Sequence, residues 1–260
     1  IDAATTVTVT ATAATTITGA ASAVATAVTA SGITTSGSFA ATVSDATVAA
    51  ADLNTIDGRT TGLVTATAAT TITGTASAVK AAIQSVGIAT STSYNATVDS
   101  GTLSVTDANI IDGDTTGVIT ATISNGAAST LKTLTGSNNA YTITVTDTTV
   151  AASDLNTIDA ATTVTVTATA ATTITGTASA VKAAIQSAGI ATSTSYNATI
   201  DSGTLSVTDA NIIDGDTTGV ITATISNGAA STLKTLTGSN NAYTITVTDT
   251  TVAASDLNTI

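Results

Sequence analysis

The chain has 260 residues, a formal net charge of −12 and only five basic residues, which excludes a nucleic-acid binder because little is available to neutralise phosphates. Hydrophobic residues make up 43% of the chain and charged residues 8%, which differs from the composition of disordered proteins, and no apolar run approaches the roughly 20 residues of a membrane span. Without Cys or His the sequence has no disulfide, no thiolate metal site and no usual activator of a nucleophile, so we predict that the chain is not an enzyme.

From the N-terminus onward, the pair Ile-Asp divides the chain into five repeats, at 1–55, 56–110, 111–157, 158–212 and 213–259. The segment Ile111–Thr157 is identical to Ile213–Thr259, so a unit of 102 residues occurs twice with few changes. The chain opens with IDAATT and closes with DLNTI, which are two parts of one motif. We therefore expect residues 1–260 to form a single repeat array that is an excerpt of a longer one.

A shorter period lies within these repeats. Aligning the Leu of AASTL with the Leu of AASDL gives ten anchor positions that are 23 to 29 residues apart, as in solenoids built from strand-plus-helix coils. The spacing predicts an α/β repeat solenoid with parallel β-strands and short helices, in about ten coils. The anchors are Val24, Leu53, Val79, Ala108, Leu131, Leu155, Val181, Ala210, Leu233 and Leu257.

The segment GTASAVKAAIQSVG predicts a helix. Thr75 is its expected N-cap, and Ala76, Val79 and Ile83 form its expected buried face. Gly87 is expected to provide the left-handed stop. The preceding TTITG either adds a second strand to the coil or widens a loop, so a one-sheet and a two-sheet cross-section both stay open.

Further along the chain, YTITVTD alternates Ile143 and Val145 with Thr, which is the pattern of a half-buried strand. The following TTVAASDLNTI places Leu155 and Ile158 on one helical face. Helices this short are unstable alone in water, so neighbouring coils must hold them by burying a continuous apolar strip. We therefore expect Leu131 and Leu155 to stack on one another.

Two acidic bends are candidate metal sites. The segment DANIIDGD occurs twice, and several carboxylates on one bend suit Ca²⁺, which binds oxygen ligands at about 2.3–2.6 Å. The spacing differs from that of an EF-hand loop, and Asp and Asn also cap helices and stabilise turns, so a purely structural role stays open. The candidate calcium ligands are Asp107, Asn109, Asp112, Asp114, Asp209, Asn211, Asp214 and Asp216.

Outward Thr side chains are a second candidate site. One Thr of each predicted strand is expected to occupy a single column on the sheet, which resembles the faces of ice-binding solenoids. The simpler interpretation is that Thr is a soluble residue that favours exposed strands. The predicted column contains Thr8, Thr42, Thr65, Thr97, Thr120, Thr144, Thr165, Thr199, Thr222 and Thr246.

Four Lys and four Tyr also recur with the repeats. Each Lys lies on the predicted solvent face of a helix, where it keeps the helix soluble or contacts an Asp of another copy. Each Tyr precedes a strand, where it covers the edge of the core or stacks on a ligand. These residues are Lys80, Lys132, Lys182, Lys234, Tyr94, Tyr141, Tyr196 and Tyr243.

The segments DLNTID, TTG and TASAVKAAI resemble repeats in very large surface and extracellular proteins of bacteria, cyanobacteria especially, and the resemblance covers the whole chain. It implies export and a role at the cell exterior, and it transfers no functional residue. We predict a structural module that forms a rigid extracellular shaft, as in an adhesin, a surface layer or a filament. Its expected partners are further copies of itself, end to end or side by side. The alternative is a module that binds ice or a glycan surface through the Thr columns.

Overall fold

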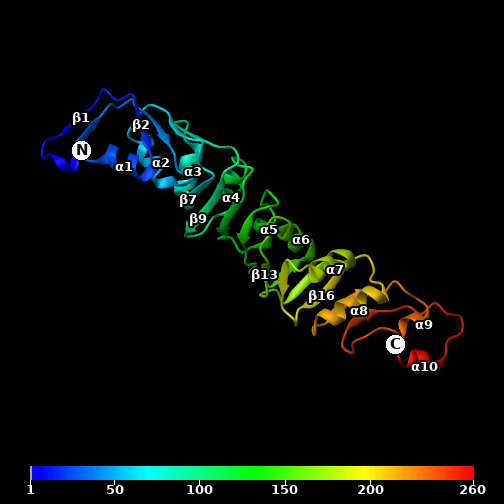
Figure 1. Ribbon diagram of the computed structural model, residues 1–260. Coiled ribbons are helices and arrows are strands. Elements are labelled where there is room, and N and C mark those ends of the chain that lie inside the picture. Colours follow the sequence, from blue (N-terminus) through cyan, green and yellow to red (C-terminus); the bar gives the residue numbers. More distant parts are fainter. Residues whose placement is uncertain (1) are drawn as a thin grey trace. The chain divides into compact units, whose positions relative to one another are not determined.

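The computed structural model of the protein describes residues 2–260 (Figure 1). The chain forms two compact units, Ile1–Ser124 with Asn138–Tyr141, and Asn125–Ser137 with Thr142–Ile260. In each unit, short helices alternate with parallel strands, which confirms the predicted α/β solenoid. The α-helices of the described residues are α1 (Ala21–Thr29), α2 (Ala50–Asp57), α3 (Ala76–Gln84), α4 (Val105–Asp112), α5 (Ala128–Leu131), α6 (Ala152–Ala160), α7 (Ala178–Gln186), α8 (Val207–Asp216), α9 (Ala230–Leu233) and α10 (Ala254–Leu257).

The strands are short and rich in Thr, Ala, Val and Ile, as expected for residues that favour a pleated surface. They are β1 (Val9–Ala11), β2 (Thr16–Gly19), β3 (Ile33–Thr35), β4 (Ala40–Val43), β5 (Thr47–Ala49), β6 (Val64–Ala66), β7 (Thr71–Thr75), β8 (Ile88–Thr90), β9 (Asn95–Ser100), β10 (Ile119–Thr122), β11 (Ala140–Thr142), β12 (Thr149–Ala151), β13 (Val166–Ala168), β14 (Thr173–Thr177), β15 (Ile190–Thr192), β16 (Asn197–Ser202), β17 (Ile221–Thr224) and β18 (Ala242–Thr244).

Strands of successive coils pair in parallel. One sheet has the order β2-β4-β6-β8, a second has the order β11-β10-β9-β7-β5, and a two-stranded sheet joins β1 to β3. In the second unit, the orders are β12-β14-β16-β17-β18 and β13-β15. A full coil such as β6, β7 and α3 therefore passes through two sheets before its helix. The TTITG segment is therefore a second strand of its coil, whereas the coil between α1 and α2 has three strands, β3, β4 and β5, each in a different sheet.

All ten anchor positions lie in the ten helices described, one in each. Leu131 and Leu155 are fully buried, and their helices α5 and α6 pack against each other. Nine of these anchor residues are buried, and the tenth, Leu257 in α10, is 48% exposed. Because each coil contributes mainly Ala, Val, Leu and Ile to a narrow core, burial of the apolar residues depends on the coils on either side.

Helix α3 begins as predicted and ends differently. The Thr75 hydroxyl accepts a hydrogen bond from the Ala78 N–H, which confirms the cap. The helix ends at Gln84 with Ser85 in an extended conformation, so the prediction of a left-handed stop at Gly87 was wrong. An added Cβ at Gly87 would collide with the Asp57 carboxylate, which accepts a hydrogen bond from the Ser85 hydroxyl. Gly87 therefore makes room for a side chain of the preceding coil.

The TTG motif holds one coil against the previous one. The Thr115 hydroxyl donates to the carbonyl of Tyr94, and the Gly117 N–H donates to that same hydroxyl. A Cβ at Gly117 would lie 2.1 Å from the Tyr94 carbonyl oxygen, so only glycine allows this approach. The arrangement recurs at Thr217 and Gly219. The motif is thus explained by packing between coils.

Within residues 2–260, no helix combines the length and the hydropathy that a membrane crossing requires.

Candidate functional site

The first acidic bend lies along α4 and just beyond its C-terminal end. Asp107 is in the first turn of α4, where its N–H donates to the Ser104 hydroxyl, and Asp112 is the last helical residue. Asp114 follows after one further residue. At about 1.5 Å of rise per residue, the start and the end of this helix are too far apart for Asp107 to share one coordination sphere with Asp114.

Each carboxylate of this bend has its own partner. Asp107 accepts a hydrogen bond from the Lys80 ammonium at 2.6 Å, and this bond holds the pKa of the Asp107 carboxyl below its ordinary value. Asp112 accepts from the Asn139 amide at 2.9 Å. Asp114 accepts from the Tyr94 hydroxyl at 2.8 Å, while burial is the main cause that raises the pKa of that tyrosine well above its usual range.

The Asp112 contact has a structural consequence. Asn139 is 2% exposed, and its side-chain oxygen accepts the N–H of Ile119 in β10 at 2.8 Å. By accepting from the Asn139 amide, Asp112 keeps that oxygen directed at the strand. A buried backbone N–H is thereby satisfied, which avoids a desolvation cost of about 1–3 kcal/mol.

The second bend repeats the pattern in the other unit. Asp209 pairs with Lys182 at 2.6 Å, Asp214 accepts from the Asn241 amide at 2.9 Å, and Asp216 accepts from the Tyr196 hydroxyl at 2.8 Å. The Lys182 hydrogen bond likewise holds the pKa of Asp209 below its ordinary value. The Asn211 amide donates to the Thr235 carbonyl at 2.8 Å, which ties α8 to the following coil.

A shallow groove runs beside each bend. The first has a volume of about 560 Å³ and is lined by Ile83, Gln84, Asn109, Ile110, Gly113 and Asp114. The second has about 390 Å³ and is lined by Ile185, Gln186, Asn211, Ile212, Gly215 and Asp216. Two of the four predicted ligands of each bend therefore border the same groove.

Across residues 2–260, no group of three or more acidic side chains is arranged to hold a metal ion. The calcium hypothesis stays a prediction, with Asp112 and Asp114, and likewise Asp214 and Asp216, as the acidic residues closest to each other along the chain. If it is correct, Ca²⁺ raises the melting temperature, a chelator reverses the rise, and Asp112→Asn with Asp114→Asn reduces it. Equal melting with Ca²⁺ and with chelator would end the hypothesis.

The predicted Thr column divides into several short ladders. Three expected pairs of neighbours are present, but each lies in a different sheet, so the prediction of one column was wrong. The reason is that most coils contribute strands to more than one sheet, and the chosen Thr residues lie in different sheets. The confirmed neighbours are Thr42 with Thr65, Thr97 with Thr120, and Thr199 with Thr222.

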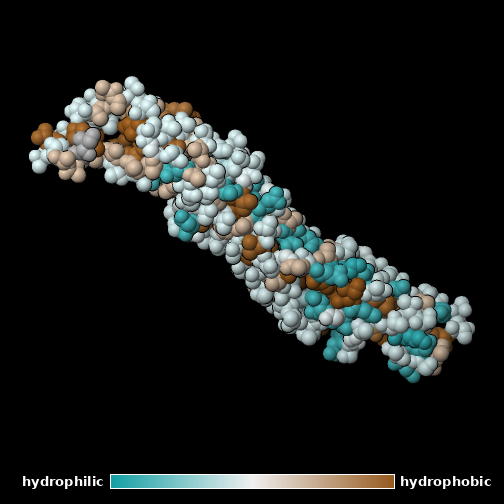
Figure 2. All heavy atoms as spheres, viewed as in Figure 1, coloured by the Kyte–Doolittle hydropathy of each residue, from teal (hydrophilic) through white to brown (hydrophobic). Residues whose placement is uncertain are grey.

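Three ladders among the described strands contain three Thr residues each, and one of them joins Thr18, Thr42 and Thr65 across β2, β4 and β6. Thr73, Thr97 and Thr120 are in register across β7, β9 and β10. Thr175, Thr199 and Thr222 repeat this ladder across β14, β16 and β17. Figure 2 shows that pale residues of intermediate hydropathy cover most of the visible face, as expected for a surface rich in Thr, Ser and Gly.

The four Lys residues pair with Asp of the next helix in the same chain. Lys80 and Lys182 bridge α3 to α4 and α7 to α8, whereas Lys132 and Lys234 bridge α5 to α6 and α9 to α10 at 3.1 and 3.2 Å. The Asp partner that we considered on another copy is thus present within the chain. Each partly exposed pair contributes about 0.2–1 kcal/mol to stability.

The structure places the Tyr residues deeper than an edge position. Tyr94, Tyr141 and Tyr196 are fully buried. Tyr243 is half-buried, and burial raises the pKa of its hydroxyl to about 12. The three buried Tyr residues therefore form part of the core, and ligand stacking has no support at these positions.

Several helices are capped across coils by residues that sequence patterns did not identify, and one of them is α8, whose Val207 N–H donates to the Asn227 side chain at 2.9 Å. Asp147 accepts the Ala128 N–H at 2.7 Å, and Asp249 accepts the Ala230 N–H at 2.7 Å. Asp45 does the same for Ala21. Because each cap follows its helix by 19 to 24 residues, no local motif signals it.

No family model matches the chain, and neither the curated proteins nor the solved structures contain a match.

Proposed function

We propose that the chain is a structural repeat module that forms a rigid shaft, a surface layer or a filament at the cell exterior. The observation that supports this proposal is that most side chains with distinctive chemistry are used between coils. The Lys–Asp pairs, the TTG motifs and the buried Tyr residues all join one coil to another. The extracellular location rests on the resemblance in repeat style.

Hydrogen bonds and ion pairs between neighbouring helices link the coils within each unit. Asn54 in α2 donates to the Ala78 carbonyl of α3 at 2.9 Å, and Lys80 in α3 then pairs with Asp107 in α4. Successive helices are therefore linked by alternating amide and ion-pair contacts. Such a stack gains stability from the number of its coils, because each interface adds a similar contribution.

The duplicated unit permits a test with matched junctions. Deleting Ile111–Ile212 joins Ile110 to Ile213, where the sequence continues as it does after Ile110 in the native chain. Inserting a further copy of the same segment lengthens the chain by the same 102 residues. Neither change creates a new local sequence.

We expect all three chains to fold, with unfolding free energy rising from the shortened to the native to the lengthened chain. If the coils form a rigid shaft, four coils at about 4.8 Å change the maximum dimension by about 19 Å in either direction. Circular dichroism with urea unfolding and small-angle scattering measure these quantities. A shortened chain that loses its fold, or equal dimensions for all three, would contradict the proposal.

The Thr ladders favour a second candidate function, which is binding to ice or to a regular glycan surface. Thr73, Thr97 and Thr120 repeat a hydroxyl and a methyl group at the strand spacing of about 4.8 Å. Thermal hysteresis of the native chain, and its loss in Thr97→Lys with Thr120→Lys, would support ice binding. Thr130→Lys on α5 is the control for added charge, and absence of hysteresis in the native chain would end this candidate.

A further inference from the structure

The dipeptide Asn-Gly occurs twice in the chain, at Asn125–Gly126 and at Asn227–Gly228. Asn is a thermolabile residue, because the backbone nitrogen of the next residue can attack its side-chain amide. Glycine permits this attack most readily, since it has no Cβ beside the nitrogen and its backbone reaches the most conformations. Every other Asn of the chain precedes Ala, Asn, Ile or Thr. The two Asn-Gly pairs are therefore the most labile amides in the sequence.

Contacts with the preceding coil explain the Asn of the second pair. The Asn227 side-chain oxygen accepts the N–H of Val207, the first residue of α8, at 2.9 Å. Just before it, the Ser226 N–H donates to the Leu205 carbonyl at 2.9 Å, and Leu205 forms a parallel bridge with Ile225. The Asn227 side chain therefore adds one more bond to this ladder, at the point where the chain of the preceding coil enters its helix.

Contacts with the following coil explain the Gly. The Thr248 N–H donates to the Gly228 carbonyl at 2.8 Å, and a Cβ on Gly228 would lie 2.5 Å from the Thr248 Oγ1. Gly126 has the same surroundings, because the Thr146 N–H donates to its carbonyl at 2.9 Å and a Cβ would lie 2.6 Å from the Thr146 Oγ1. Two separate packing requirements thus place a labile dipeptide between coils.

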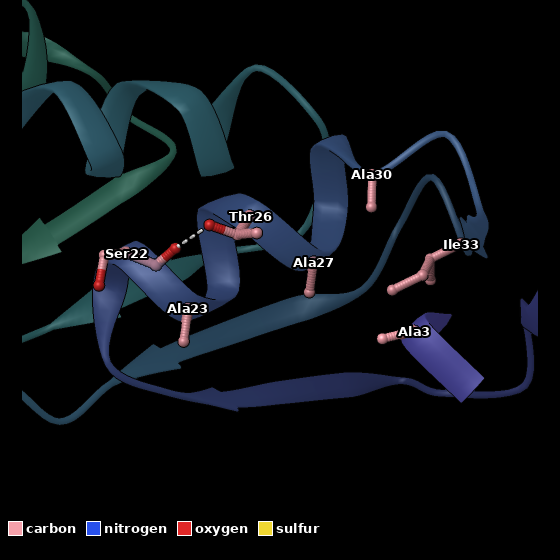
Figure 3. Close-up of a pocket in the computed structure, with 7 residues that line it drawn as sticks. All are labelled: Ala3, Ser22, Ala23, Thr26, Ala27, Ala30 and Ile33. Atoms are coloured by element: carbon pink, nitrogen blue, oxygen red, sulfur yellow. Dashed lines mark hydrogen bonds between the residues drawn. The ribbon is translucent and has the colours of Figure 1, made fainter. Parts of the chain in front are cut away.

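An Asp could supply the same acceptor, and the caps of α1, α5 and α9 described above are Asp residues. None of these three helices has an acidic residue in its first turn, and in α1 this turn carries Ser22 and Ala23 (Figure 3). Helix α8 differs, because Asp209 lies in its first turn. A neutral Asn227 avoids a second carboxylate at the same helix end, where like charges would repel each other.

The reaction at Asn227 consumes only water. The Gly228 nitrogen bonds to the side-chain carbonyl carbon of Asn227, and the side-chain nitrogen leaves as ammonia with the proton that the Gly228 nitrogen loses. Water then opens the resulting cyclic imide at either of its carbonyls. One opening gives an aspartate with an ordinary main chain, and the other gives an isoaspartate whose main chain runs through the former side chain. Both products carry one additional negative charge.

We propose that Asn227 and Asn125 are deamidation sites that stacked coils protect and opened coils expose. In the folded chain, the Val207 bond holds the Asn227 side chain toward the preceding coil, while the Thr248 bond holds Gly228 toward the following one. Ring closure rotates the peptide group between these two restraints, so it requires the coil to open first. Deamidation is then limited by local unfolding of the stack.

The two products have different consequences for the coil. The aspartate keeps an acceptor for the Val207 N–H, as Asp147 does for the Ala128 N–H. The isoaspartate lengthens the main chain between two contacts that neighbouring coils fix, so the Val207 and Thr248 bonds cannot both form again. An opened coil that forms isoaspartate therefore stays altered at this interface.

Peptide mapping by mass spectrometry tests the location and the protection. The full chain is incubated in mildly alkaline buffer, folded or unfolded in urea. In urea, Asn227 and Asn125 should deamidate together and well before Asn156, which precedes Thr157. In the folded chain, both sites should react at least about ten-fold more slowly, because the reaction waits for local opening. Equal rates with and without urea, or rates in urea no higher than that of Asn156, overturn the proposal.

Val207→Pro tests the restraint at one site only. Proline is favoured at the first position of a helix, and Ser206 already has the extended conformation that precedes proline, with φ −71° and ψ 154°. The variant removes the N–H that binds Asn227. Deamidation of Asn227 in the folded chain should accelerate by about two- to ten-fold, the equivalent of one hydrogen bond. Asn125 in the same molecule is the matched control, and an unchanged ratio of the two rates contradicts the proposal.

A urea series on the native chain tests the same restraint without a substitution. Circular dichroism first establishes whether Val207→Pro folds. In the native chain, deamidation at Asn227 and Asn125 should accelerate with urea below the main unfolding transition, because local opening exposes apolar surface. The peptide ISNGAA, which occurs at both sites, reports the direct effect of urea on the chemistry. Rates that follow the peptide alone would show that the coils give no protection.

Discussion

The segments Ile111–Thr157 and Ile213–Thr259 are identical in sequence and different in structure. The first contains strand β12 and the start of α6, which has nine residues. In the second, residues 251–253 form no strand, and α10 has only four residues. Since the sequences are the same, the difference comes from the coil that follows the first segment.

The two segments diverge at a defined point. Leu131 and Leu233 are both fully buried, so the two segments bury this anchor equally. Further on, Val145 is fully buried, whereas Val247 is half-buried. The same local sequence therefore packs more tightly where residues 2–260 include a coil on each side of it.

The largest expected effect compares Leu155 with Leu257. Leu155→Ala creates a cavity between coils and should lower the unfolding free energy by about 2–5 kcal/mol. Leu257→Ala removes a side chain that is 48% exposed and should change it by less than about 1 kcal/mol in a monomer. Urea unfolding measures both, and equal losses would show that the last coil is as well packed as the interior one.

Two glycines at matching positions of the repeat should instead give equal losses of stability. Gly117→Ala and Gly219→Ala each place a Cβ about 2.1 Å from a Tyr carbonyl oxygen, so both should destabilise the fold by about 1–3 kcal/mol. Because Tyr94 and Tyr196 are equally buried, the two losses should agree. Gly101→Ala is unsuitable as a control since its φ is positive, whereas Gly37→Ala has open space and should be nearly neutral.

A smaller difference in stability is expected between alanine substitutions at Asn156 and at Asn258. Asn156→Ala removes the hydrogen bond to the Ala180 carbonyl and should cost about 0.5–1.5 kcal/mol. Asn258→Ala should leave the stability of a monomer unchanged, because Asn258 is exposed. Urea unfolding of the two variants measures this difference, and equal losses would contradict it.

The smallest expected effect concerns the ion pairs at Asp107 and Asp209. Their folded-state pKa values are lowered from 3.8, chiefly by hydrogen bonds from Lys80 and Lys182. The unfolded chain then binds more protons in this range, so stability is present above pH 3.8 and is lost as the pH falls through the folded-state values. Lys80→Met with Lys182→Met should cost about 0.2–1 kcal/mol per pair near neutral pH and reduce this acid dependence. Unfolding curves between pH 2 and 7 are the measurement, and an unchanged acid slope would contradict the assignment.

Much of the fold could be predicted from local patterns. The spacing of Leu131, Leu155 and the other anchors located a helix in every coil, and the alternation around Ile143 identified inward and outward positions correctly. These patterns are readable because side-chain direction has a period of two in strands and 3.6 in helices. The candidate sites were less predictable: Asp112 supports Asn139, and Asp114 binds Tyr94, across 20 to 27 residues.

By itself, the sequence determined the repeat, the helices and the alternation of Thr with apolar residues, because these depend on contacts within a few residues. Only the tertiary structure decided which strands share a sheet, which carboxylate meets which partner, and whether a given copy of an identical segment is closed or open. The physical reason is that a coil of about two dozen residues has too little apolar area to fix its own structure, so its neighbours supply the remaining contacts.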